Sequence, residues 1–509
     1  MRARLLIALI AGALIPQAHA PFDHFWVAPL SYALLFHLWG GLRPFQAFWV
    51  GFAFGCAAFL SGVHWVYVSI HDYGLAHPLI ASAITGALVV YLGAYVGLTG
   101  WIASHWFTNR GTVAWLAVFP AVTLLTEWCR NWVLSGFGWL APGYSQTDSW
   151  LMGYAPVGGV YLMTWAVLVS AGALPALAFG RWRLRAAVAV GIALIWGGGY
   201  FLGNLRWSEA TGSVIPAALV QGAVPQELKW LPEQLPATLD LYRRLTEEAG
   251  DSRLIVWPEA AIPTLYAQAE GYLGEIRDWA GARGGQVALG ILRDDPGGGT
   301  FQNTLVVLDE EPSFYVKRHL VPYGEYFPVP GFVRQWLRLM SLPYTDAVPG
   351  DPDQPPLDIA GERVGVSICY EDLFGAEQRH YLPEATLLIN VSNDAWFGDT
   401  VAPHQHLQIA RVRAAEASRY LLRATNTGIS AFIDPRGRVV SRSPAFEPHV
   451  LRGAVQGFTG GTPYARWGDW LAVIGAALVL LTCLFQRRLS RGRFRSMGVS
   501  GRRRVNPRS

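Results

Sequence analysis

The amino-acid sequence predicts a protein of two parts, a set of membrane helices and an α/β domain. Hydrophobic residues make up 52% of its 509 residues and charged residues only 15%, a balance that is typical of membrane proteins. Apolar stretches fill residues 1–205, a polar region follows over residues 212–458, and a last apolar stretch covers residues 466–486. These observations predict seven membrane spans, one large domain and an eighth span.

Eight stretches approach or exceed the length of about 20 mostly apolar residues that a spanning helix needs. They cover residues 4–19, 23–40, 46–70, 78–106, 112–132, 153–179, 184–204 and 466–486. Residues 1–20 also have the features of a secretory signal peptide, because Arg2 and Arg4 precede an apolar core that ends in Ala-His-Ala. Of these two interpretations, we expect that the segment is retained as the first span.

The distribution of Lys and Arg predicts which side of the membrane each loop faces, because cytoplasmic loops are enriched in these residues. Arg residues precede the first span, and they recur after the second, fourth and sixth spans and in the basic tail, residues 487–509. The opposite loops nearly lack them, and the exception, Arg130, has Glu127 one helical turn away as a partner. We therefore expect the tail in the cytoplasm, beside anionic lipid rather than nucleic acid, and residues 212–458 on the opposite side.

Within residues 212–458, short apolar runs alternate with helix-like segments. Several runs, such as residues 364–369 and 386–391, are continuously apolar or nearly so, which is the pattern of strands that are buried on both faces. Helix-like segments lie near residues 232–249, 271–283 and 405–419. This alternation predicts a layered α/β domain.

Three of the predicted strands end in a chemically reactive side chain, namely Glu259, Lys317 and Cys369. Sites in open α/β sheets gather at strand ends, and a thiol becomes a good nucleophile when a base or a cation helps it to ionise. Glu259 is suited to take the thiol proton, and Lys317 to stabilise the thiolate and then an oxyanion, with the backbone N–H of Tyr370 as second donor. The alternative for the single Cys of this region is a small buried apolar residue.

Neither a metal nor a cofactor is expected. His404 and His406 have no further cluster of ligands near them in the sequence. The glycine run at residues 297–299 lacks the Lys and the Ser or Thr that follow in a phosphate-binding loop.

Several short segments carry a resemblance to a known family. Residues 257–259 (Trp-Pro-Glu), 317–326 and 369–372 (Cys-Tyr-Glu-Asp) resemble the signature of the nitrilase, or carbon–nitrogen hydrolase, superfamily. Residues 221–226 and 393–398, together with the spans, resemble its membrane-embedded branch, the apolipoprotein N-acyltransferases. The resemblance implies an α-β-β-α sandwich and a catalytic triad of Glu, Lys and Cys.

The same resemblance implies the reaction. Cys369 would take an acyl chain from a phospholipid, with phosphatidylethanolamine as the expected donor, and would hold it as a thioester. The N-terminal amine of an S-diacylglyceryl-cysteine on an apolipoprotein would then accept the chain, which is the last step of bacterial lipoprotein maturation. The domain of residues 212–458 would lie on the periplasmic side of the inner membrane, and a monomer would suffice.

Five further residues receive roles from the resemblance alone. Glu325 would support the triad by holding Lys317, and Tyr370 and Glu371 would shape the loop of the nucleophile. Trp230 and Trp396 would bind substrate, although ordinary packing or a role as an interfacial anchor would explain each tryptophan equally well.

Two other functions compete with acyl transfer as interpretations of the sequence. A membrane-anchored amidase would use the same triad with water as acceptor, but it has no evident need for seven spans. A transporter should carry ionisable residues inside its spans, and here these are few, namely His37, His64 and the pair Glu127 and Arg130.

Residues 333–344 mix Trp and Leu with two Arg and would form either a lid at the membrane surface or part of the core.

Overall fold

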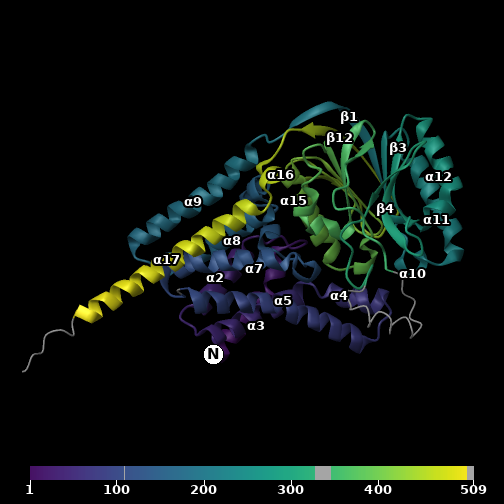
Figure 1. Cartoon of the computed structure of the whole chain (residues 1–509). Helices are drawn as coiled ribbons and strands as arrows, with labels where there is room; N and C mark the ends of the chain where they lie inside the picture. Colours follow the sequence, from purple (N-terminus) through teal and green to yellow (C-terminus); the bar gives the residue numbers. More distant parts are fainter. Residues whose placement is uncertain (108, 327–345, 501–509) are drawn as a thin grey trace, which may run out of the picture.

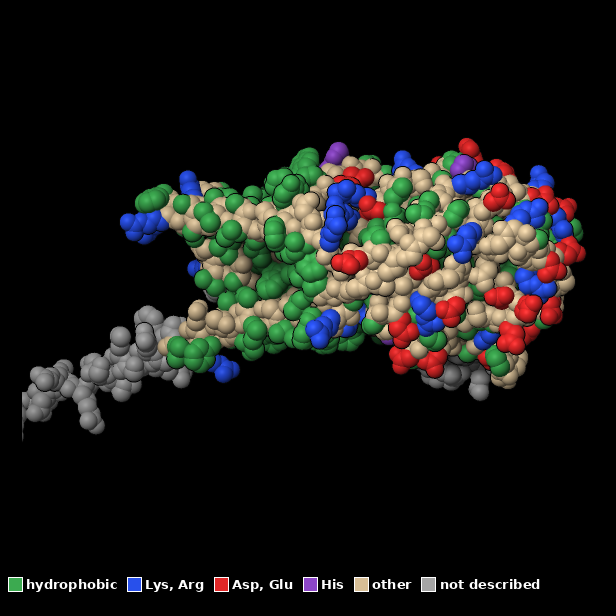
Figure 2. Space-filling view, turned by 90° about the horizontal axis from the view of Figure 1, so that it is seen from above, with side chains coloured by type: hydrophobic (Ala, Val, Ile, Leu, Met, Phe, Trp, Pro, Cys, Tyr) green, Lys and Arg blue, Asp and Glu red, His purple; other side chains and the backbone are tan. Residues whose placement is uncertain are grey.

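Two six-stranded sheets and a bundle of apolar helices make up the computed structural model (Figure 1), which describes residues 1–107, 109–326 and 346–500. The helices lie on one side of the molecule and the sheets on the other (Figure 1). Asp, Glu, Lys and Arg gather on the part built from the sheets, whereas the helical part shows mainly hydrophobic side chains and few charges (Figure 2). This division agrees with the two predicted parts.

Six helical segments among the described residues are long and apolar enough to cross a membrane. They are α3 (Pro44–Gly62), α5 (Pro78–Trp106), Gly111–Arg130 with α7 (Phe119–Arg130), Trp150–Phe179 with α8 (Ala155–Phe179), α9 (Trp182–Asn204), and Trp470–Leu489 within α17 (Trp470–Ser500). All six overlap predicted spans.

The first two predicted spans form shorter helices. Helix α1 (Arg2–Ala13) has 12 residues and α2 (Val27–Trp39) has 13, fewer than the about 20 that a straight crossing needs. A short 3-10 turn (Ile15–Ala18) follows α1, and Pro16 within it has no N–H with which to continue an α-helix. The predicted number of eight spanning helices is therefore not confirmed, and six are found among the residues that the structure describes.

Glycines allow close packing of the first long helices. A Cβ atom on Gly51 of α3 would lie 2.4 Å from the backbone oxygen of Val96 in α5, and one on Gly93 of α5 would lie 2.6 Å from the sulfur of Cys56. Small residues at such crossings let helix backbones approach each other, and they are a common means of packing in membranes.

Each sheet has parallel strands at its centre and antiparallel strands at its edges. The first, in the order β12-β1-β2-β3-β4-β5, contains β1 (Glu209–Gln221), β2 (Leu254–Leu265), β3 (Gln286–Asp294), β4 (Phe301–Leu308), β5 (Ser313–Val316) and β12 (His449–Thr459). The second, in the order β11-β10-β9-β8-β7-β6, contains β6 (Leu357–Ile359), β7 (Glu362–Ile368), β8 (Leu387–Ser392), β9 (Leu421–Thr425), β10 (Ala431–Ile433) and β11 (Val439–Arg442).

The two sheets face each other across an apolar core, which side chains such as Val256, Val366 and Ile389 fill. Helices α11 (Leu235–Glu248) and α12 (Tyr266–Gly281) cover the outer face of the first sheet, as Figure 1 shows. Helix α15 (Ala402–Ala417) packs on the second sheet and also contacts α8. The segments that follow β7 and β8 lie close to Glu259 within β2: the backbone N–H of Asn393, after β8, donates to the Glu259 carboxylate at 2.9 Å, and the thiol of Cys369, after β7, interacts with it electrostatically.

Candidate functional site

The three predicted triad residues meet at one end of the facing sheets. Glu259 lies within β2, and Lys317 directly follows β5. The Lys317 Nζ atom is 3.1 Å from Glu259 Oε1, and both side chains are buried. Cys369 directly follows β7 in a left-handed conformation with φ of +53°, and its thiol interacts electrostatically with both Glu259 and Lys317. The structure thus places the three side chains in one site.

Burial and charge together set the protonation states of the three groups. Burial acts to lower the pKa of Lys317, but the carboxylates of Glu259 and Glu325 outweigh it and raise that pKa well above its usual value. For Glu259, burial acts to raise the pKa, but Lys317 and the hydrogen bonds to the carboxylate lower it. Burial, reinforced by Glu259, raises the pKa of Cys369 despite Lys317. The resting site therefore holds a carboxylate, an ammonium and a neutral thiol.

Glu325 occupies its expected place beside Lys317, with 2.9 Å between Glu325 Oε1 and Lys317 Nζ. Its other oxygen accepts a hydrogen bond from the backbone N–H of Val321 at 2.8 Å. Asn303 of β4 joins the two carboxylates, because its side-chain nitrogen donates to Glu259 Oε1 at 2.7 Å and to Glu325 Oε1 at 2.9 Å. We did not predict Asn303, although a polar residue within the apolar run of β4 was a signal for it.

Glu371 ties the turn after β5 to the turn after β7. Its carboxylate accepts hydrogen bonds from the backbone N–H groups of Arg318 and Ile368, at 2.7 Å each, and from the hydroxyl of Tyr315. Burial raises the pKa of Glu371. Because these partners adjoin Lys317 and Cys369, Glu371 holds together the backbones that carry both residues.

A second buried network supports the backbone of Cys369 from the other side. His406 of α15 lies between Asp394 and Cys369, with His406 Nδ1 2.9 Å from Asp394 Oδ1 and His406 Nε2 3.2 Å from the Cys369 carbonyl oxygen. Arg423 of β9 donates to Asp394 Oδ2 at 2.9 Å. Burial acts to raise the pKa of Asp394, but Arg423 and His406 outweigh it and hold that pKa below its usual value. We did not predict this network.

Lys229 is a second buried amine beside the triad. It closes a single helical turn, α10 (Gln226–Lys229), and its side chain is 1% exposed. Its Nζ atom donates to the backbone oxygen of Glu259 at 3.3 Å, and among the described residues no carboxylate lies within ion-pair distance of it. Burial lowers the pKa of Lys229 to about 8. The Lys229 amine thus lies close to Glu259, the proposed base, and loses its proton more readily than an ordinary lysine.

Trp230 and Trp396 lie on segments next to the triad, but their own side chains are 46% and 41% exposed. Trp230 directly follows Lys229, and the backbone oxygen of Trp396 accepts a hydrogen bond from Ser69 at 2.7 Å. Their exposure leaves both rings open to a ligand but does not place them in the buried cluster. Residues 333–344, the possible lid, lie outside the described residues.

Tyr370 reaches away from the triad towards the membrane helices. The Tyr370 hydroxyl donates to the backbone oxygen of Gly136 at 2.8 Å, and Gly136 belongs to the loop that follows α7. The ring packs edge to face on His319, with the two centroids 5.7 Å apart. Tyr370 therefore joins the nucleophile turn to the helical part of the molecule.

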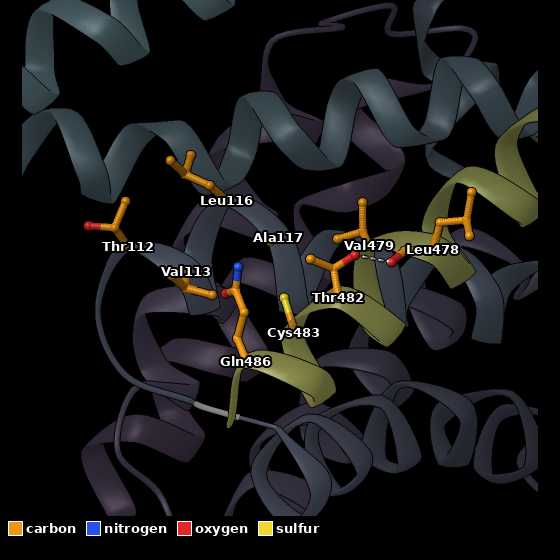
Figure 3. Close-up of a pocket in the computed structure, with 9 residues that line it drawn as sticks. All are labelled: Thr112, Val113, Leu116, Ala117, Leu478, Val479, Thr482, Cys483 and Gln486. Carbon is orange, nitrogen blue, oxygen red and sulfur yellow. Dashed lines mark hydrogen bonds between the residues drawn. The ribbon is translucent and has the colours of Figure 1, made fainter. Parts of the chain in front are cut away.

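An apolar groove of about 470 Å³ lies elsewhere, between α17 and the segment before α7. Leu116, Val479 and Cys483 are among the residues that line it (Figure 3). Its lining contains no Asp, Glu, Lys, Arg or His that could activate the Cys483 thiol. Within the part of the chain that the structure describes, no cluster of three or more His, Cys, Asp or Glu could hold a metal ion.

Comparison with known proteins agrees with this fold. Residues 216–464 match the family model for carbon-nitrogen hydrolase, and residues 11–174 match that for the apolipoprotein N-acyltransferase N-terminal domain. The solved structure of Nit3 from Saccharomyces cerevisiae, a member of the nitrilase superfamily, is 20% identical and has a TM-score of 0.36; the match covers 49% of this chain and 93% of Nit3. The match of residues 216–464 to the family model indicates a fold of the nitrilase-like carbon–nitrogen hydrolase type.

Relatives along nearly the whole chain narrow the class. The apolipoprotein N-acyltransferase of Methylococcus capsulatus is 42% identical over 485 residues, which cover 95% of this chain and 96% of the relative. That of Nitrosomonas europaea is 40% identical over 484 residues, with coverage of 94% and 96%. The chain therefore belongs to the apolipoprotein N-acyltransferase family. Its six long apolar helices agree with a multi-pass membrane acyltransferase.

Proposed function

We propose that this protein moves an acyl chain from a phospholipid to the N-terminal amine of a diacylated apolipoprotein, through a thioester on Cys369. The observation that carries the proposal is the buried pair of Glu259 and Lys317, 3.1 Å apart, in electrostatic contact with the Cys369 thiol. Each of the three groups is in the protonation state from which a thiol nucleophile would start.

The first half of the reaction forms the thioester. Glu259 accepts the thiol proton, and the Cys369 sulfur attacks the ester carbonyl carbon of the phospholipid. Lys317, with the backbone N–H of Tyr370, stabilises the negative charge that develops on the carbonyl oxygen. When the carbon–oxygen bond breaks, Glu259 returns the proton to the leaving oxygen, and a lysophospholipid departs.

The second half transfers the chain to the acceptor. The neutral amine of the apolipoprotein attacks the thioester carbonyl, Lys317 again stabilises the oxyanion, and the carbon–sulfur bond breaks. Glu259 accepts the proton that the new amide nitrogen releases, and the proton then returns to the Cys369 sulfur. Division into two steps through a covalent intermediate lowers each barrier, and both substrates are held in the bilayer, which favours their encounter.

The location follows from the substrates. We place residues 1–205 and 466–486 in the inner membrane, residues 212–458 on the periplasmic side and the tail, residues 487–509, in the cytoplasm. Phosphatidylethanolamine is the proposed donor. Trp230 and Trp396 would meet the lipid chains, because both are exposed aromatic side chains beside the triad. All triad residues come from one chain, so one copy suffices for the chemistry.

The test is the formation of the acyl adduct. The full chain is purified in detergent and incubated with phosphatidylethanolamine that carries a labelled sn-1 chain, without acceptor. We expect hydroxylamine-sensitive label on the wild type, none on Cys369→Ala, and unchanged labelling of Cys129→Ala, which removes a cysteine of α7 far from the triad in the sequence. A diacylglyceryl-cysteine peptide should then discharge the label as an amide.

Two results would contradict the proposal. Label that persists in Cys369→Ala would remove Cys369 from the reaction. An absence of label, together with hydrolysis of small amides that depends on Cys369, would identify a membrane-anchored amidase instead.

A further inference from the structure

A single loop of the helical part contacts both turns that carry the triad. This loop, residues 131–141, follows α7. The backbone oxygen of Ser135 lies 2.9 Å from Nε2 of His319, two residues beyond Lys317. One residue further, the oxygen of Gly136 accepts the hydrogen bond from Tyr370, which follows Cys369 directly.

The same loop also contacts the network behind the nucleophile. The indole ring of Trp139 lies against the imidazole of His406, with ring centroids 5.6 Å apart, and its N–H donates to Gln405 at 2.6 Å. His406 in turn lies 3.2 Å from the carbonyl oxygen of Cys369. Loop 131–141 thus supports the nucleophile turn from two directions.

One buried guanidinium holds this loop in shape. Arg130, the last residue of α7, is 0% exposed, and its Nη1 atom donates to the backbone oxygens of Phe137 and Trp139, the latter at 3.0 Å. Phe137 directly follows Gly136, which contacts Tyr370, and Trp139 is the residue whose ring contacts His406. The Nη2 atom of Arg130 is paired with the carboxylate of Glu127, which is 4% exposed.

The backbone of the loop requires such a support. Leu134, Ser135 and Gly136 have φ values of +54°, +73° and +80°, and non-glycine residues in this region cost energy that the surroundings must supply. A charged donor to two carbonyls fixes their positions more firmly than a neutral one. Removing the guanidinium would leave those carbonyls, and the carboxylate of Glu127, without their partner.

We propose that the Glu127–Arg130 pair is a positioning device for the nucleophile, because it fixes loop 131–141 against the turn of Cys369. The inference rests on the proposed function, in which Cys369 is the nucleophile. It assigns to a charge pair at the end of a membrane helix a part in catalysis, although neither residue touches the reacting atoms.

Two measurements on the full chain in detergent test the inference. The first is hydrogen exchange of the backbone amides of residues 369–374, which measures how often the turn opens to solvent and does not depend on activity. The second is the rate at which Cys369 acquires label from the phospholipid. The variants are Arg130→Met, Arg130→Lys, and Glu127→Leu combined with Arg130→Met, in which no charge is left unpaired and the fold is better preserved.

The matched control is Arg411→Met. Arg411 of α15 also joins the sheet part to the helical part, through Asp148 at 2.6 Å and the backbone oxygen of Thr147 at 3.1 Å, but not through loop 131–141. In Arg130→Met and in the double variant, we expect hydrogen exchange at residues 369–374 to become about tenfold faster and labelling of Cys369 to become about tenfold slower. A tenfold factor corresponds to the loss of about one strong hydrogen bond. Arg130→Lys should recover part of both, and Arg411→Met should change neither by more than about twofold.

A cycle with Tyr370→Phe separates positioning from general loosening. If Arg130 acts through the loop, Tyr370→Phe slows labelling of the wild type but has little further effect in Arg130→Met. Independent, multiplied effects would overturn the inference, as would unchanged exchange in Arg130→Met or faster exchange with unchanged labelling. Faster exchange in a protein whose wild type acquires no label would instead refute the proposed function and leave the structural role of the pair in place.

Discussion

Substitution of Asn303 by Asp should convert a hydrogen-bond donor that two carboxylates of the site share into a third acid. The side-chain nitrogen of Asn303 donates to Glu259 at 2.7 Å and to Glu325 at 2.9 Å. The new carboxyl would keep the shape of the side chain but would face two carboxylates at the same distances. The prediction therefore probes the arrangement of the site directly.

The size of the effect follows from the charges. Two carboxylates about 2.8 Å apart repel each other by about 6 kcal/mol at an effective dielectric constant of about 20. Protonation of the new Asp carboxyl costs less than this repulsion. A carboxyl with a pKa of about 3.9 is protonated at a cost of about 1.36 kcal/mol for each pH unit above its pKa, which is about 4 kcal/mol at pH 7 and about 1.5 kcal/mol at pH 5. The folded protein will bind that proton, so its new carboxyl has a raised pKa and the destabilisation shrinks as the pH falls towards the unfolded value.

The assay is thermal unfolding in detergent, followed by tryptophan fluorescence at both pH values. Relative to wild type, the Tm deficit of Asn303→Asp should be smaller at pH 5 than at pH 7 by about 5–10 °C, from about 2–4 °C per kcal/mol in a domain of this size. Asn303→Ala is the matched control, since it removes both hydrogen bonds without adding a charge and its deficit should not change between the two pH values. Equal deficits of Asn303→Asp at both pH values would refute the placement of Asn303 between the carboxylates.

Three further predictions concern the same site. Because burial raises the pKa of Cys369, the rate at which iodoacetamide alkylates this thiol should rise with pH up to about pH 9 without a plateau. The thiolate fraction grows about tenfold per pH unit below the pKa. A plateau near pH 7 would contradict the raised pKa. Lys229→Met, which removes a buried cation beside Glu259, should slow acyl-adduct formation about tenfold at pH 7 with less effect in Lys229→Arg, and equal rates in all three proteins would deny the amine a role. Glu371→Gln should lower both the Tm and the labelling rate, because loss of hydrogen bonds to a charged acceptor costs about 1–3 kcal/mol. Each kcal/mol should lower the Tm by about 2–4 °C. A loss of labelling at unchanged Tm would give Glu371 a direct part in the chemistry.

The sequence predicted the elements that carry the triad because these elements have strong local signals. Continuous apolar runs identified the central strands, as in β7 and β8, and the last residue of each run pointed to the site. Glu259 and Cys369 belong to different sheets, so the strand pattern by itself did not predict that they meet; only the resemblance to the family implied it. The edge strands β6, β11 and β12 were missed, since edge strands are shorter or partly exposed and lack a continuous apolar run.

The supporting residues were less accessible from the sequence. Glu127 and Arg130 were recognised as a pair from their spacing of one helical turn, and the structure contains that ion pair. The contact of Tyr370 with Gly136 joins residues 234 positions apart, and no periodicity in either segment announces it. Helix α1 was predicted too long because hydropathy continues past Ala13, whereas the missing N–H of Pro16 ends the regular hydrogen bonding.

The charges of the site explain how a buried thiol can react at all. Within the described residues around the triad, the carboxylates of Glu259 and Glu325 both pair with the amine of Lys317, and the amine of Lys229 donates to the backbone oxygen of Glu259. Transfer of the Cys369 proton to Glu259 moves a negative charge from carboxylate to sulfur and leaves the total unchanged, so no net charge is created in a water-poor interior. The raised pKa of the thiol keeps Cys369 protonated at rest, and the proposed reaction would begin with this proton transfer.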